Sequence, residues 1–169
     1  MKKLFCALLI VSSFSIGAFA DSPGAGRLGA GIMIGEPTAL TGKYWLTRNQ
    51  AVDFGFGFWT YHSTIIFGDY HWYWPEIFGH KNKFVGDLSL YVGVGGGVAS
   101  WRDRYWCNRW RCEATGDSGT AIFVRVPVGV EWFPGHPPLG VFVEVSPSFS
   151  ISPGMSGYLD FATGIRYYF

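Results

Sequence analysis

Histidines and serines are the first residues to test for catalysis, because a histidine beside a serine hydroxyl can activate it as a nucleophile. The histidines are His62, His71, His80 and His136. Only His62 adjoins a serine, Ser63, and neighbouring residues on a strand point to opposite faces, so the two cannot readily share one proton. His71 lies two positions after Asp69, which predicts a buried structural pair. We therefore expect no catalytic residues.

The cysteines do not have the spacing of a metal site. Cys107 and Cys112 are separated by four residues, and no second pair of cysteines or histidines stands at zinc spacing. In an oxidising compartment two nearby cysteines form a disulfide, so we predict one between them. The stretch "GAGRLG" (residues 24–29) matches the dinucleotide-binding fingerprint, but that fingerprint needs a strand before it and a helix after it. The sequence predicts no metal and no cofactor.

The first twenty residues have the pattern of a secretory signal peptide. Two lysines precede an apolar core, and "AFA" at residues 18–20 is a small-x-small cleavage site. The core is short and interrupted by serines, which disfavours a membrane anchor. Cys6 precedes the core, where a lipid-anchoring cysteine would follow it. We expect residues 1–20 to be the signal peptide and residues 21–169 to form one domain.

Composition disfavours nucleic acid as a partner and helices as membrane spans. The formal net charge is +1 at pH 7, so bulk charge does not point to a polyanion. Aromatic residues make up 19% of the chain and glycines number 24. Beyond the signal peptide no apolar run reaches the roughly 20 residues that a membrane helix needs. The apolar pattern must therefore be read at the two-residue period of β-strands.

Eight segments alternate between apolar residues and polar or small residues. In "AVDFGFGFW" (residues 51–59), Val52 and three phenylalanines share one face, while Asp53 and two glycines share the other. The segments are residues 27–35, 40–47, 51–59, 66–74, 87–95, 122–132, 139–146 and 158–169. Each has about the length of a membrane-spanning strand. Pro127 lies inside the sixth segment, and because proline cannot donate to the ladder we predict a β-bulge there.

This alternation fits two kinds of barrel that point opposite faces inward. A soluble, periplasmic lipocalin-like carrier fills its interior with the apolar face, whereas an outer-membrane barrel turns that face to lipid. Aromatic girdles at both interfaces are typical of the membrane barrel. Aromatic residues of the apolar face gather near segment ends: Tyr70, Trp72, Trp74, Trp132, Tyr167 and Phe169. We therefore predict an all-β fold, an eight-stranded antiparallel up-and-down transmembrane β-barrel.

The polar face is expected to line a packed lumen. It carries charges of both signs, which must pair when buried. It also carries glycines, which make space, because eight strands enclose room only for side chains. The predicted lumen network comprises Arg27, Lys43, Asp53, Asp69, His71, Asp87, Arg125, Glu131, Glu144, Asp160 and Arg166. Lys43, Arg125 and Glu144 are expected to pair near mid-height.

The last strand and two internal stretches resemble known membrane barrels. Gram-negative barrels end on an alternating strand with a terminal aromatic residue, which the assembly machinery recognises, and Ile165, Tyr167 and Phe169 match this pattern. The stretches "GEPTALTGKYWL" (residues 35–46) and "RVPVGVEWF" with "PPLGVFVEVSP" (within residues 125–147) resemble a family of small, largely uncharacterised outer-membrane barrels of OmpA/OmpX-like shape. The resemblance implies a monomer, exported through the periplasm, that contacts outer-membrane lipids, lipopolysaccharide and the barrel assembly machinery.

A lipid-modifying enzyme is the alternative within such barrels. The eight-stranded lipid A deacylases are similar in size and have a His-x-Ser motif with a glutamate on the outer face. No histidine of this chain is followed by serine at the second position. We therefore expect a structural or surface-interaction role and no enzymatic activity.

The stretch of residues 101–119, "WRDRYWCNRWRCEATGDSG", should be the longest outer loop. If both termini face the periplasm, the connection after the fifth strand faces outward. Arginine suits phosphate binding and stacks on aromatic rings, so we expect this loop to contact lipopolysaccharide phosphates or another anionic surface partner. The alternative is a loop that merely covers the barrel mouth. Its candidate binding residues are Trp101, Arg102, Arg104, Tyr105, Trp106, Arg109, Trp110 and Arg111.

Overall fold

The computed structural model describes residues 26–59, 63–75, 77–79, 84, 87–101, 105–108, 111–114 and 118–169. Two of these ranges, 105–108 and 111–114, are described by their backbone. The predicted signal peptide lies outside the described residues, so its cleavage stays a prediction. Within the described ranges, no helix is both long and apolar enough to cross a membrane.

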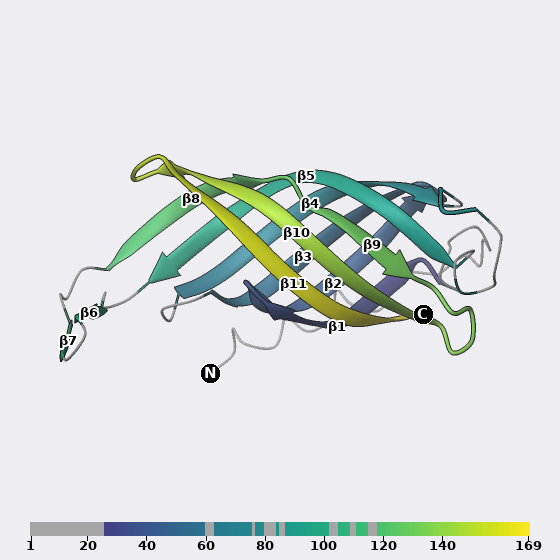
Figure 1. Cartoon of the computed structure of the whole chain (residues 1–169), viewed down its shortest axis with the longest axis horizontal. Coiled ribbons are helices and arrows are strands. Elements are labelled where there is room, and N and C mark those ends of the chain that lie inside the picture. Colours follow the sequence, from purple (N-terminus) through teal and green to yellow (C-terminus); the bar gives the residue numbers. More distant parts are fainter. Residues whose placement is uncertain are drawn as a thin grey trace, which may run out of the picture.

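Most of the described chain is β-strand, as the two-residue alternation predicts. Nine strands form one antiparallel sheet, and a separate two-stranded hairpin extends beyond one end of it (Figure 1). The sheet contains β1 Leu28–Gly35, β2 Thr38–Thr47, β3 Gln50–Trp59, β4 Ser63–Pro75, β5 Leu88–Trp101, β8 Gly119–Arg125, β9 Val128–Trp132, β10 Leu139–Ser152 and β11 Ser156–Tyr168, and the hairpin contains β6 Tyr105–Asn108 and β7 Arg111–Ala114.

The sheet closes into a barrel because its first and last strands pair. β1 pairs with β2 on one side and with β11 on the other, where Ala30 lies opposite Tyr167. β8 and β9 both lie between β5 and β10, so together they occupy one strand position around the barrel. Each such position is called a stave here. The nine strands of the sheet therefore form eight staves, and the prediction of an eight-stranded antiparallel up-and-down barrel is confirmed.

Pro127 interrupts the stave of β8 and β9 without adding a residue to it. The partners of Arg125 and Val128 are three residues apart on both neighbouring strands, as Arg125 and Val128 are on their own. The predicted bulge is therefore wrong, because a bulge would shift this register. Proline lacks the N–H that the ladder uses, but its carbonyl still accepts a 2.7 Å hydrogen bond from the backbone of Gly93.

The apolar face of the strands points outward and the charged face points inward. On β3, Phe54 and Phe56 are 52% and 50% exposed, whereas Asp53 is 2% exposed. The same orientation is found on β2, where Leu40 is 66% exposed and Lys43 is 0% exposed. A lipocalin-like barrel requires the opposite orientation.

The interior is layered along the barrel axis. One end, called the loop end here, carries the β1–β2 and β10–β11 connections, the end of β3 and the beginning of β4. The other, called the terminal end, carries the β2–β3 turn and the C-terminus (Figure 1). Charged residues lie between two apolar clusters. The cluster toward the loop end contains Met33, Ala39, Ile65, Phe67, Ala99, Phe123, Phe142 and Ala162, and that of the terminal end contains Trp45, Ala51, Tyr73, Tyr91, Phe133 and Tyr168.

Candidate functional site

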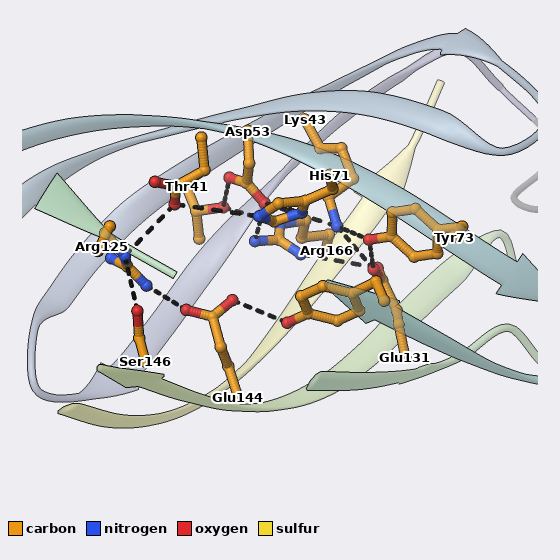
Figure 2. A network of polar contacts seen from close by, with 12 residues as sticks. Thr41, Lys43, Asp53, His71, Tyr73, Arg125, Glu131, Glu144, Ser146 and Arg166 are labelled. Carbon is orange, nitrogen blue, oxygen red and sulfur yellow. Dashed lines mark hydrogen bonds and ion pairs between the residues drawn. The ribbon is translucent and has the colours of Figure 1, made fainter. Parts of the chain in front are cut away.

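A network of charged side chains occupies the middle of the barrel (Figure 2). Alternate residues of a strand share one face, so the inward positions of neighbouring staves meet in the lumen. The buried charged members and their histidine are Lys43, Asp53, Asp69, His71, Arg125, Glu131, Glu144 and Arg166. All of them belong to the network that the alternation predicts.

Glu131 accepts hydrogen bonds from side chains of three other staves. Lys43 lies 2.7 Å from its Oε2, and the hydroxyl of Tyr73 donates to the same oxygen at 2.7 Å. The hydroxyl of Tyr168 donates to Oε1 at 2.6 Å. Lys43 also donates to the Tyr73 hydroxyl. Arg166 Nη1 lies 3.7 Å from Oε1. This fully buried carboxylate is therefore satisfied by two cations and two hydroxyls, as a buried charge requires.

Arg166 joins this cluster to Asp53. Its Nη2 donates to Asp53 Oδ2 at 2.6 Å, and its Nε donates to the hydroxyl of Thr41 at 2.7 Å. The guanidinium carbon lies 3.8 Å from the centre of the Phe142 ring, in cation–π contact. Lys43 lies 3.5 Å from the same Asp53 oxygen. Asp53 therefore bridges two cations, one from β2 and one from β11.

Arg125 forms the second half of the network. Its Nη2 contacts Glu144, its Nε donates to the Ser146 hydroxyl at 3.1 Å, and the same Nε lies 3.5 Å from Asp69. The hydroxyl of Tyr91 donates to the other Glu144 oxygen at 2.8 Å. The expected pairing of Lys43, Arg125 and Glu144 is thus divided, because Lys43 contacts Glu131 and Asp53 instead.

His71 lies between two aspartates without a hydrogen bond to either. Its Nδ1 is 3.9 Å from Asp53, its Nε2 is 4.0 Å from Asp69, and neither nitrogen has a hydrogen-bond partner among the described residues. The ring stacks on Tyr91 at 4.8 Å. These contacts place His71 in the packed interior beside Asp69, where a structural role was expected.

Three predicted lumen charges lie apart from this network. Arg27 and Asp87 are half-buried at the terminal end. Asp160 is 5% exposed and lies toward the loop end, where the Ser148 hydroxyl donates to it at 2.5 Å. The charges are therefore distributed along the axis, with the densest group in the middle.

The hydroxyl groups that bond to the charged side chains, as donors or as acceptors, were not predicted as site residues. They occupy the same inward rows as the charges, so the period-two pattern places them in the lumen, but composition gave no reason to single them out. They are Thr41, Tyr73, Tyr91, Ser146, Ser148 and Tyr168.

Inward glycines leave room for this network. A Cβ on Gly140 would lie 2.5 Å from Glu131 Oε1, and a Cβ on Gly95 would lie 2.1 Å from Asp69 Oδ1. Real Cβ atoms do not approach other atoms so closely, so larger residues at these positions would displace the carboxylates. The glycine-rich inner face is therefore part of the packing of the charged side chains.

Aromatic rings pack across the lumen at the terminal end. Trp45 lies 4.5 Å from Tyr73 and 5.9 Å from Phe133, and Phe133 lies 5.7 Å from Tyr168. Tyr73 also stacks on Tyr91 at 5.1 Å. These rings and the network together fill the bore that eight staves enclose.

The loop end contains a cavity of about 730 Å³. Its walls come from the ends of β3, β5 and β10 and the beginnings of β4, β8 and β11. Trp59, Trp101 and Tyr158 contribute rings, and Asp160 contributes a carboxylate. Among the residues that the structure describes, no group of three or more histidine, cysteine, aspartate or glutamate side chains could hold a metal ion.

Comparison with solved structures finds similarity to small barrel proteins. The N-terminal β-barrel domain of OprF from Pseudomonas aeruginosa matches with a TM-score of 0.57 and 11% identity, covering 83% of this chain and 93% of that chain. Neisserial surface protein A (NspA) matches with a TM-score of 0.49 and 12% identity, covering 84% and 93%. Ail from Yersinia pestis, solved with the heparin analogue sucrose octasulfate, matches with a TM-score of 0.35 and 15% identity, covering 83% and 92%.

No protein-family model matches the chain, and no curated protein sequence matches it. The likeness to the OprF domain shows a shared fold, in agreement with the small OmpA/OmpX-like barrel shape implied by the sequence resemblance.

Removing one partner of the central network should destabilise the barrel. Lys43→Met leaves Glu131 without its nearest cation, and Glu131→Gln leaves Lys43 poorly paired. Each single substitution should lower the free energy of unfolding by about 3–5 kcal/mol, the cost of an unpaired buried charge. Urea unfolding in lipid vesicles, followed by the heat-dependent shift in gel mobility, measures this loss.

The double variant Lys43→Met/Glu131→Gln is the matched control. Because it removes both charges together, it should lose less free energy than the sum of the two single losses. Single effects that add within about 0.5 kcal/mol would show that the two residues do not interact.

The packed lumen should not conduct ions. Refolded protein in planar bilayers should give no large, stable conductance steps, because aromatic rings and paired charges occupy the bore. A porin reconstituted in the same bilayers provides the positive control. Reproducible large steps from the barrel alone would show a continuous water path and contradict this packing.

Proposed function

We propose that this protein is an integral barrel of the Gram-negative outer membrane, with its outer face in lipid and its charged face in a packed lumen. The observation that carries this proposal is that the apolar face of the strands points outward and the charged face points inward. Outward phenylalanines on β3 are 50–62% exposed, while Asp53, which directly precedes the first of them, is 2% exposed. Large exposed apolar surfaces are rare on soluble monomers, whereas a membrane barrel needs an apolar band facing lipid.

Aromatic residues at both ends of the outer face support the same orientation. Those at the terminal end include Tyr44, Trp72, Trp74, Tyr167 and Phe169, and those toward the loop end include Phe58, Phe149 and Phe161. Tyr and Trp favour the membrane–water interfaces. The proposed assembly residues Ile165, Tyr167 and Phe169 are 41%, 45% and 61% exposed on this face, where the barrel assembly machinery could contact them.

We assign the protein a structural and surface-interaction role through its outer loops. The β6–β7 hairpin extends beyond the loop end (Figure 1), and its backbone pairs Cys107 opposite Cys112. Residues directly opposite in an antiparallel pair lie close enough to make the proposed disulfide favourable. Arg111, Tyr105 and Trp106 belong to this hairpin.

The other members of the proposed loop surface do not belong to the hairpin strands. Arg102, Arg104, Arg109 and Trp110 lie outside the described residues, so their contact with lipopolysaccharide phosphates or another anionic partner is a proposal from sequence. Trp101 ends β5, pairs opposite Gly119 and lines the loop-end cavity.

The enzymatic alternative receives no support from His71, because neither of its ring nitrogens has a hydrogen-bond partner, serine included, among the described residues. Ser63 and His71 lie on the same strand, eight residues apart, which corresponds to about 26 Å at 3.3 Å per residue. A serine and its general base must come within about 3 Å. Unchanged lipid A acylation after expression of the protein is the expected result, and a lost acyl chain would contradict the non-enzymatic role.

A depth-dependent substitution tests the membrane orientation. Phe54→Arg places a charge on the outer face near mid-height and should cost about 2–4 kcal/mol of unfolding free energy in vesicles, whereas Tyr44→Arg near the terminal end should cost about 0–1 kcal/mol. Urea titration in vesicles measures both values. A soluble barrel would tolerate both arginines equally, so equal small costs would overturn the proposal.

Removing the loop arginines tests the surface role. Changing Arg102, Arg104, Arg109 and Arg111 to serine should abolish binding to purified lipopolysaccharide, because clustered arginine contributes the charge that recognises phosphate. The heat-dependent gel shift should remain, because the barrel strands are unaltered. Parental binding should weaken with added salt. Undiminished binding by the serine variant would leave the loop as a cover for the mouth.

A further inference from the structure

The loop-end cavity is a feature that the closure and packing of the barrel do not require. Small inward residues create it at a level where larger side chains would fill the bore. Ala99 on β5 is paired with Ala121 on the neighbouring strand β8, and Ser63, Ser150 and Ser156 supply further short side chains. Its volume of about 730 Å³ falls in the range of pockets that bind small molecules.

Aromatic rings are held in place around this cavity. Trp59 meets Tyr158 edge-on at 5.4 Å and Phe123 at 5.8 Å. The Trp101 ring lies over Gly119, where an added Cβ would come within 2.4 Å of it. The walls are therefore formed by rings with defined neighbours, and they come from four different staves.

A carboxylate lies among these rings. Asp160 is 5% exposed, lines the cavity, and accepts a 2.5 Å hydrogen bond from Ser148 behind it. Glu36 contributes a second carboxylate on the β1–β2 side. Among the described residues that line the cavity, none is basic. In a cavity that is lined by a carboxylate and aromatic rings, the carboxylate attracts a cation by charge and the ring faces add cation–π contact.

We propose that the loop-end cavity binds a small organic cation with an alkylammonium group, which is held between the rings of Trp59, Trp101 and Tyr158 and the carboxylate of Asp160. The rings accept the methyl or methylene surface of such a group while their faces stabilise its charge. An inorganic cation would leave the apolar walls unused, and an anion would meet the carboxylates unfavourably.

Choline and its uncharged isostere 3,3-dimethylbutan-1-ol separate charge recognition from apolar binding. The refolded barrel, in maltoside micelles that carry no ammonium groups, is titrated with each probe and followed by tryptophan fluorescence and calorimetry. Choline should bind at least ten-fold more tightly than the isostere. Equal affinities would reduce the site to an apolar hollow, and no choline binding would overturn the proposal.

Two variants assign the binding to this cavity. Asp160→Asn keeps the size of the side chain but removes its charge, and should weaken choline binding about ten-fold. Ala121→Trp fills the cavity and should abolish binding. Asp87→Asn, at the terminal end, is the matched control and should bind choline as the parent does. Choline affinity unchanged by Asp160→Asn, in a variant that retains the gel shift, would contradict the proposed role of the carboxylate.

Vesicles distinguish a free cation from a lipid headgroup as the source of the ammonium. If lipid headgroups reach the site, choline affinity should fall in phosphatidylethanolamine vesicles relative to phosphatidylglycerol vesicles. Equal affinities would assign the site to soluble cations. Either result retains alkylammonium recognition and decides which molecules supply it.

Discussion

Charged side chains that point into an eight-stranded barrel have almost nothing to solvate them except one another. Their strands leave too little bore for bulk water, and an isolated buried charge is very costly. This constraint determines the interior of the protein. Lys43, Arg125 and Arg166 each contact two carboxylates, and glycines stand where any larger residue would separate the partners.

The buried cations are too few to neutralise all the buried carboxylates of the lumen. The described buried side chains include five carboxylates but three cations, leaving His71 aside. Hydroxyl groups provide the remaining donors: Tyr73 and Tyr168 to Glu131, Tyr91 to Glu144, Thr41 to Asp53 and Ser148 to Asp160. Asp69 is the exception, because its Oδ1 has no hydrogen-bond partner among the described residues. The polar interior is therefore a mixed array of charges and hydroxyls rather than a set of separate ion pairs.

Sequence periodicity could predict the barrel but not the partners within it. Alternation in "AVDFGFGFW" correctly separates Phe54 from Asp53, because each strand has a strict period of two. Which charges meet depends on the stagger between staves, which no single segment contains. Arg166 contacts Asp53 over 113 positions of sequence, and Lys43 contacts Glu131 rather than Glu144.

Strand lengths were predicted less well toward the loop end. β5 reaches Trp101 and β10 reaches Ser152, well beyond the predicted ends at residues 95 and 146. The β5 extension begins with two glycines and the β10 extension begins with Pro147, so the periodic pattern appeared to end there, and backbone pairing with neighbouring staves maintains both extensions. The loop-end cavity lies among these extensions, which explains why the periodic pattern gave no indication of it.

Closure of the sheet by β1 and β11 has a consequence for the order of assembly. Arg166 lies on the last strand, so Asp53 and Glu131 receive this cation only when that strand completes the ring. Geometric closure and charge neutralisation are therefore a single event. A chain that lacks its final strand would have an open sheet edge and two undercompensated carboxylates together, and this coupling penalises incomplete copies before they reach the folded state.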